Sequence, residues 1–159
     1  MKTSIFTLLF TFCFFTVNAQ QNDYKLLLDT FFLHAENGFK DIIGEQSDTE
    51  SNFFPSKLVM DIGETKIYKS SYTYSTLNWI IPLAESKKAQ QAVQDFIKTT
   101  FADTKLYKTI NENDQSDDNN AITSIIQIYR IKPNGEKPAL VFQTMMDKKQ
   151  FTITIYEKH

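Results

Sequence analysis

The first part of the chain carries apolar residues at the three- and four-residue spacing of a helix. Asp23 is a favourable N-cap residue. The residues after it predict a helix with one apolar face, formed by Tyr24, Leu27, Leu28, Phe31 and Ala35. Gly38 is expected to weaken or end this helix. Leu26 and Leu33 lie on the opposite face, where either another segment covers them or they are scattered surface residues. We favour the second interpretation, because isolated apolar residues are common on protein surfaces.

A second helical pattern lies in the middle of the chain. Ser86 is expected to cap it. Its apolar positions form one stripe, made of Ala89, Ala92, Val93, Phe96, Ile97 and Phe101. Polar residues occupy most of the other positions, so this helix is expected to pack with one side on a sheet.

Elsewhere the pattern of apolar and polar residues has a period of two, which is typical of strands. Strands are expected over residues 57–62, 66–70, 74–83, 105–110, 121–131, 139–145 and 151–156. Polar residues over 45–52 and 111–120 predict loops, and Lys-Pro-Asn-Gly at 132–135 predicts a turn. In the last strand, Phe151, Ile153 and Ile155 alternate with Thr and Tyr, which suits an antiparallel sheet with one face in water.

The order of these elements is a helix, a meander of short strands, a second helix and a second meander. Residues 22–84 and 86–157 therefore repeat one helix-plus-meander unit in pattern, although few residues are identical between them. The predicted fold class is α+β. It is a pseudo-duplicated, two-layer sandwich in which both helices lie on one face of an antiparallel sheet.

This outline resembles small exported bacterial domains built on a duplicated helix-plus-meander unit, such as the beta-lactamase-inhibitor-like fold. The stretch Phe39-Lys40-Asp41-Ile42-Ile43-Gly44 also resembles uncharacterised exported domains. The resemblance implies the order of elements and assigns no function. Inhibitors of that fold depend on cysteines, which are missing after residue 13, so inhibitor activity is not carried over.

The N-terminal 19 residues have the pattern of a secretory signal peptide. Lys2 precedes an apolar run over residues 5–17, and Val17-Asn18-Ala19 fits the cleavage site. The run is shorter than the roughly 20 residues that span a bilayer. Cys13 lies inside the run and follows Phe-Thr-Phe, which argues against lipidation. We expect one domain over residues 20–159, periplasmic or secreted, with no transmembrane segment after cleavage.

Composition excludes several classes of function for residues 20–159. This part has no cysteine, so thiol nucleophiles, disulfides and cysteine-based zinc sites are excluded. Sixteen basic residues stand against nineteen acidic ones, which gives a net charge of −3. Arg130 is the only arginine. Proteins that bind nucleic acid usually carry a basic face and favour arginine, so no nucleic-acid partner is expected.

The sequence carries few groups with a recognisable catalytic pattern. His34 and His159 are the only histidines, and no nucleophile motif accompanies either. They are too far apart in sequence to predict a metal site. Glu112, Asp114, Asp117 and Asp118 form an acidic cluster that lacks the spacing and the glycine of a calcium loop. No cofactor and no metal are therefore expected.

Tyrosines in the first meander are the best candidate contact residues. Tyr68, Tyr72 and Tyr74 fall on even positions, and Trp79 follows nearby. Tyr and Trp on an exposed sheet face can bind a sugar or a protein. The alternative is ordinary strand composition, since Tyr is favoured in sheets.

These observations favour a non-catalytic binding or interaction module of the cell envelope or extracellular space. Its partner would be a protein, a glycan or a small ligand. Two other functions remain open. One is a small secreted hydrolase or lyase whose Asp, Glu, Tyr and Lys residues come together on folding. The other is a carrier of an apolar ligand, which needs a cavity between helices and sheet.

Overall fold

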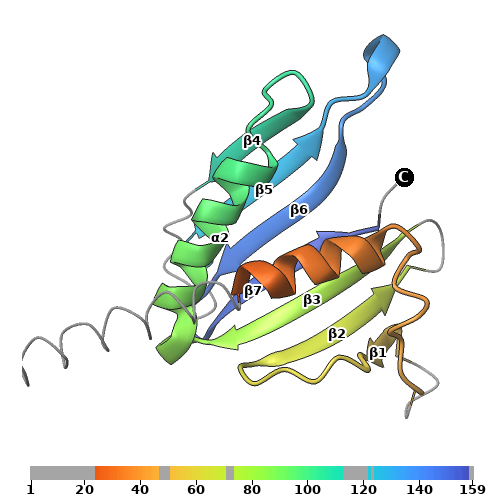
Figure 1. Ribbon diagram of the computed structural model, residues 1–159, viewed down its shortest axis with the longest axis vertical. Coiled ribbons are helices and arrows are strands. Elements are labelled where there is room, and N and C mark those ends of the chain that lie inside the picture. Colours follow the sequence, from red (N-terminus) through yellow and green to blue (C-terminus); the bar gives the residue numbers. More distant parts are fainter. Residues whose placement is uncertain (1–23, 47–50, 71–73, 113–121, 123, 158–159) are drawn as a thin grey trace, which may run out of the picture.

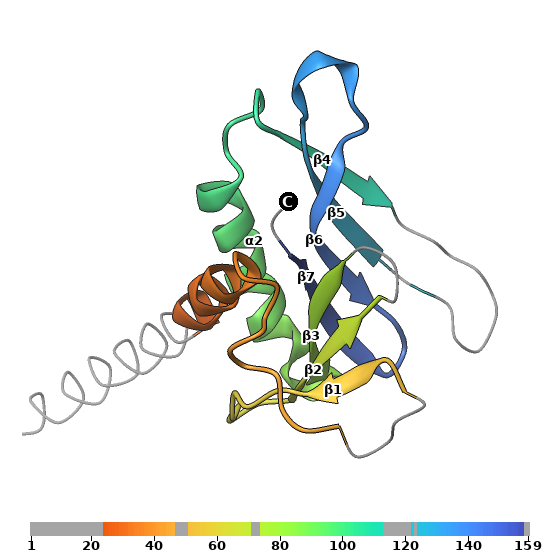
Figure 2. The same cartoon turned by 90° about the vertical axis from the view of Figure 1, so that its right-hand side faces the viewer.

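A computed structural model describes residues 24–46, 51–70, 74–112, 122 and 124–157. In this part of the chain, two helices lie on one face of a seven-stranded antiparallel sheet (Figures 1 and 2). The predicted α+β class and the two-layer arrangement are confirmed. Neither described helix is long and apolar enough to cross a bilayer.

The sheet joins two meanders edge to edge. Its strands are β1 (Phe53–Pro55), β2 (Glu64–Lys69), β3 (Ser75–Pro82), β4 (Tyr107–Glu112), β5 (Ser124–Arg130), β6 (Ala139–Met146) and β7 (Gln150–Tyr156). Their spatial order is β1-β2-β3-β7-β6-β5-β4. The last strand of each meander thus pairs with the other at the centre of the sheet. The predicted pseudo-duplication stays a prediction.

Alternation along the central strands decides which side chains face the helices. In β3, the side chains of Leu77, Trp79 and Ile81 are fully buried. They pair across to Ile155, Ile153 and Phe151 of β7, which are also buried. Directly opposed residues on neighbouring strands share a face, so these rows form the floor of the core. The alternation predicted for both strands is confirmed.

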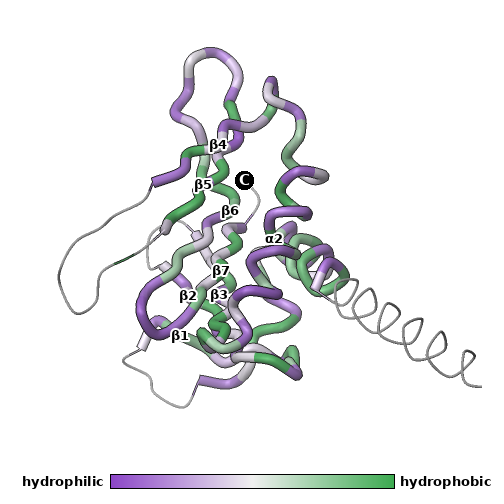
Figure 3. Tube along the Cα trace, turned by 90° about the vertical axis from the view of Figure 1, so that its left-hand side faces the viewer, coloured by the Kyte–Doolittle hydropathy of each residue, from purple (hydrophilic) through white to green (hydrophobic). Residues whose placement is uncertain are grey.

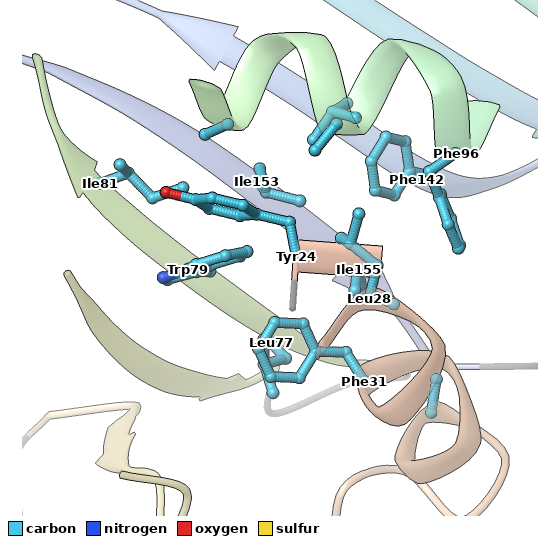
Figure 4. Packing of buried hydrophobic residues seen from close by; sticks show 14 of the residues in the cluster. Tyr24, Leu28, Phe31, Leu77, Trp79, Ile81, Phe96, Phe142, Ile153 and Ile155 are labelled. Carbon is cyan, nitrogen blue, oxygen red and sulfur yellow. The ribbon is translucent and has the colours of Figure 1, made fainter. Parts of the chain in front are cut away.

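The helices supply the other half of the core. The first covers residues 24–35, and α2 covers Ser86–Thr100 after a short 3₁₀ turn, η1 (Leu83–Glu85). Tyr24, Leu28 and Phe31 of the first helix and Phe96 of α2 point toward the sheet (Figure 4). In Figure 3, α2 alternates between hydrophobic and hydrophilic residues, as an amphipathic helix does. Leu26 and Leu33 are each 66% exposed, so no described segment covers them.

Backbone conformation explains where the first helix ends. Gly38 has a φ of 67° and Phe39 a φ of 62°, both in the left-handed region. A glycine that follows a helix commonly adopts this conformation. The left-handed turn directs the fully buried Phe39 back into the core. The prediction that the helix ends near Gly38 is confirmed; the predicted cap, Asp23, lies outside the described residues.

Two local predictions were wrong. Residues 57–62 form a loop rather than a strand, and the first strand is β1, which pairs with β2 through Phe53 and Tyr68. Ser86 is not the cap of α2. It lies in the first turn of the helix, where its hydroxyl donates to the Leu83 carbonyl at 2.7 Å. The predicted turn after residue 131 is confirmed as η2 (Pro133–Gly135), with Asn134 at a φ of 62°.

Candidate functional site

The structure separates Trp79 from Tyr68 and Tyr74, the two described tyrosines of the proposed contact site. Tyr74 is 41% exposed, and Tyr68 is half-buried on β2. Tyr68 pairs with Thr76, whose position alternates with the buried Leu77, so Tyr68 lies on the face away from the helices. Trp79 is fully buried under the helices, and its proposed role in an exposed site was wrong. Tyr72 lies outside the described residues.

The face away from the helices, called here the helix-free face, has a row of uncharged polar side chains at its centre. Asn78, Thr154, Gln143 and Gln127 are consecutive cross-strand neighbours on β3, β7, β6 and β5. The Thr154 hydroxyl donates to Asn78 Oδ1 at 2.8 Å. Gln127 Nε2 donates to Gln143 Oε1 at 3.4 Å. We call these four residues the amide row.

Tyrosines flank the amide row. The rings of Tyr74 and Tyr156 lie 6.1 Å apart between centroids. The Tyr156 hydroxyl donates to Gln143 Oε1 at 3.4 Å, and the Tyr129 hydroxyl donates to Gln127 Oε1 at 3.3 Å. Burial raises the pKa of Tyr156, and the phenols of Tyr74 and Tyr129 raise it further. The Tyr156 hydroxyl therefore stays neutral and acts as a hydrogen-bonding group near neutral pH.

Sequence reasoning missed Tyr129, Tyr156 and the amide row. The signal was present in the last strand, where Thr152, Thr154 and Tyr156 were correctly placed on the face opposite the core. If the pairing of β7 with β3 had been known, Tyr156 would have been predicted to lie near Tyr74. That pairing brings together strands from different meanders, and the alternation within each strand does not specify it.

His34 makes a close contact with a carboxylate. Its Nδ1 lies 2.7 Å from Asp41 Oδ2, and its side chain is 18% exposed. Although partial burial alone would raise the pKa of Asp41, hydrogen bonds from the Asn37 and His34 side chains lower it. The contact joins the last turn of the helix to the turn that follows, next to the hydrogen bond from Phe39 N to the His34 carbonyl. This geometry gives His34 a structural role at the helix end.

The acidic cluster contributes little to the described surface. Glu112 is exposed at the end of β4, whereas Asp114, Asp117 and Asp118 lie outside the described residues. Within the described ranges, no group of three or more His, Cys, Asp or Glu side chains is placed to hold a metal ion.

A small hollow of about 210 Å³ lies beside Tyr24, Trp79 and the 59–62 loop. The two rings stack at 5.6 Å between centroids, and Trp79 Nε1 donates to the Ile62 carbonyl at 2.9 Å. The buried Tyr24 hydroxyl has no hydrogen-bond partner in the described part of the chain. Burial raises the pKa of Tyr24, and the nearby Glu85 carboxylate adds to this effect. The hollow is a packing defect at the edge of the core, smaller than typical ligand pockets.

Comparisons with protein families, with curated proteins and with solved structures give no match for this chain. The resemblance to the beta-lactamase-inhibitor-like fold therefore stays a prediction.

Proposed function

We propose that this protein is a non-catalytic binding module, exported to the cell envelope or extracellular space, that binds a neutral glycan with the helix-free face. The observation that carries the proposal is the combination of tyrosine rings and amide side chains on that face. Aromatic rings offer flat, rigid contact area with a polar tip. Amide side chains both donate and accept hydrogen bonds, as sugar hydroxyl groups require of their partners.

The distribution of charge favours a neutral partner. On the helix-free face, the residues that the register places on β3, β7, β6 and β5 are all uncharged. Charged side chains on this face belong to strands further from the centre of the sheet, such as Lys66 on β2 and Lys108 on β4. A charged partner would find no complementary charge over the amide row, whereas a hydroxyl-rich partner would find both donors and acceptors.

The hydrogen bonds within the face leave capacity for a ligand. Gln143 Oε1 accepts from both Tyr156 and Gln127 at 3.4 Å, which is long for such bonds. Long hydrogen bonds are weak, so exchanging them for bonds to a sugar costs little. Tyr74 is the most exposed of the described tyrosines on this face, so its ring is available for stacking.

Binding to a panel of soluble polysaccharides tests the proposal, with neutral dextran and laminarin compared with anionic alginate. We expect retention by a neutral member of the panel. Tyr74→Ala and Gln143→Ala should each weaken that retention about fivefold or more, since truncating a contact residue at a binding surface costs about 1 kcal/mol or more. Gln94→Ala, at an exposed position on α2, makes the same change as Gln143→Ala and should have no effect.

Two results would contradict the proposal. One is that no neutral polysaccharide binds. The other is that Gln94→Ala weakens binding as much as Gln143→Ala. Retention of alginate in preference to the neutral chains would also contradict it, because the central strands offer that anion no cation on this face.

A further inference from the structure

A larger pocket opens on the opposite side of the sheet, in the corner between the two helices. The helices diverge toward their C-terminal ends (Figure 1), and the pocket lies between those ends and strands β4 to β7. Its cavity volume is about 330 Å³, within the range of small-ligand sites. Its lining includes Phe32, Leu33, Phe101, Tyr107, Arg130 and Val141. We call it the corner pocket.

The wall of the corner pocket is aromatic and firmly held. The Phe32 ring lies 5.7 Å from Phe101 and 5.9 Å from the buried Phe142, measured between centroids. Phe101 meets Tyr107 edge-on at 4.9 Å. Because each ring packs against a neighbour, the wall is preorganised for an apolar ligand, which reduces the entropy lost on binding.

A β-bulge helps to shape the pocket. On β6, Phe142 pairs with Ile128 and Leu140 pairs with Tyr129, so Val141 is the extra residue between them. A bulge redirects side chains relative to a regular strand. Val141 lines the corner pocket, where it adds an aliphatic surface beside the aromatic wall.

Arg130, the only arginine of the chain, supplies the positive charge of the pocket. It pairs directly with Tyr107 across β4 and β5, and its guanidinium carbon lies 6.0 Å from the centroid of that ring. This cation–π contact positions the group without using its N–H donors. Arg130 lines the pocket, and among the described residues no carboxylate forms an ion pair with it.

Two carboxylates share the rim and limit the charge of a ligand. Asp29 is paired with Lys25, with 2.7 Å between Asp29 Oδ2 and Lys25 Nζ. Glu36 also lines the pocket. A second anionic group on a ligand would meet repulsion from this rim, whereas a single carboxylate can be placed against Arg130 alone.

We infer that the corner pocket binds a small monocarboxylic acid with an apolar body. The carboxylate accepts hydrogen bonds from the Arg130 guanidinium, whose planar fork matches its two oxygens. The apolar body lies against Phe32, Phe101 and Val141. The pocket opens on the helix side of the sheet and the amide row lies on the other side, so the inference does not rest on the proposed glycan function. Tyr156, at the end of β7, lines the pocket and also flanks the amide row.

Binding of three eight-carbon probes tests this inference by NMR titration of the purified protein. Octanoate carries the carboxylate, octanol has the same apolar body without charge, and octylamine carries the opposite charge. We expect octanoate to bind at least about tenfold more tightly than octanol, since a hydrogen bond to a charged group exceeds a neutral one by about that factor. Octylamine should bind more weakly than octanoate. The amide signals of Phe101 and Tyr107 should shift, and that of Gln143 should not.

Variants of Arg130 separate a specific site from adsorption to an apolar surface. Arg130→Gln should reduce the octanoate affinity about tenfold and leave octanol binding unchanged, while Arg130→Lys should fall between the two proteins. Lys108→Gln removes the same charge from an exposed position on β4 whose cross-strand partner, Tyr129, is on the helix-free face, and it should bind octanoate normally.

Several outcomes would overturn the inference. The first is equal affinity for octanoate and octanol. The second is an Arg130→Gln protein that is folded by circular dichroism and binds octanoate as well as the parent protein does. The third is a set of NMR shifts that cluster outside the corner pocket. Absence of saturable shifts with millimolar octanoate would overturn it too. None of these results bears on the polysaccharide experiment, so the two proposals fail separately.

Discussion

Removal of the Phe96 ring tests how the two helices hold the core together. Phe96 is 2% exposed, in the middle of the apolar stripe of α2. Its ring lies 5.4 Å from Phe32, 6.0 Å from Phe101 and 6.3 Å from Phe142, measured between centroids. It therefore joins the first helix, the end of α2 and the sheet. Phe96→Ala would leave a cavity at the meeting point of these three elements.

The cost follows from how far the surroundings can close over that cavity. Replacing a buried Phe by Ala costs about 3–5 kcal/mol, and less where neighbours relax into the space. Phe96→Ala removes one packing neighbour of Phe32 and one of Phe101, so these two rings can move into part of the vacated space. We therefore expect a loss near the lower end, about 3 kcal/mol. This is a large part of the roughly 5–15 kcal/mol that stabilises a typical domain.

Urea denaturation followed by far-ultraviolet circular dichroism measures the loss. With a slope of about 1–3 kcal/mol per molar urea, the midpoint should fall by about 1–3 M. Lys98→Ala, on the exposed side of the same helix, should change stability by no more than about 0.5 kcal/mol. If the two variants have the same midpoint, the assignment of the helix faces, and with it the packing argument, is refuted.

Three further predictions concern single residues. Gly63 has a φ of 75°, and a Cβ there would clash with a backbone carbonyl of β3, so Gly63→Ala should cost more than about 1 kcal/mol. Gly135→Ala, at a similar φ with open space around it, should cost less in the same urea assay; an equal loss would mean that crowding at Gly63 is unimportant. Although burial acts in the opposite direction, hydrogen bonds lower the pKa of Asp41. The stability that this carboxylate contributes is therefore complete above the ordinary carboxyl pKa of 3.8, and it is lost as the pH falls through the lower pKa of the folded state. His34→Ala should flatten this acid loss in pH-dependent unfolding, and an unchanged slope would exclude the contact as its cause. The exported protein should begin after Ala19 by intact-mass measurement, and an intact N-terminus would disprove cleavage there.

The part of the fold that sequence predicted best is the part with one buried face. Along β3 and β7, every second residue is held under the helices, so buried apolar residues recur at every second position and identify both the strand and its inner face, although Ile80 interrupts the alternation in β3. The stripe of α2 was predictable for the same reason. In these elements, burial and secondary structure have the same period.

The 57–62 segment shows where that reasoning fails. Leu58, Met60 and Ile62 pack against the core and Val59 is 95% exposed, so the alternation of burial is real. The segment nevertheless forms no strand ladder, because it is the connection between β1 and β2 laid over the edge of the core. A pattern of burial therefore does not establish hydrogen bonding to a neighbouring strand.

The candidate sites were less predictable because they depend on how distant elements meet. The period of two did not decide which face the tyrosines occupy. The strand register places Tyr68 away from the helices and Trp79 inside the core, so proximity in sequence to the tyrosines was misleading. The corner pocket depends on the divergence of the helices and on the bulge at Val141. Neither is encoded in a local pattern, and the single arginine at Arg130 was the only available signal.

The two proposed sites provide a control for each other because they alternate along one strand. On β5, Gln127 and Tyr129 lie on the helix-free face, while Ile128 and Arg130 lie on the face of the helices. If each site acts through its own contacts, Arg130→Gln should change octanoate binding and leave polysaccharide binding intact, and Gln143→Ala should do the reverse. A variant that weakens both would act through the shared strands, and the urea midpoint would then fall with binding. Measuring both ligands on both variants therefore distinguishes two local surfaces from one change in the stability of the sheet.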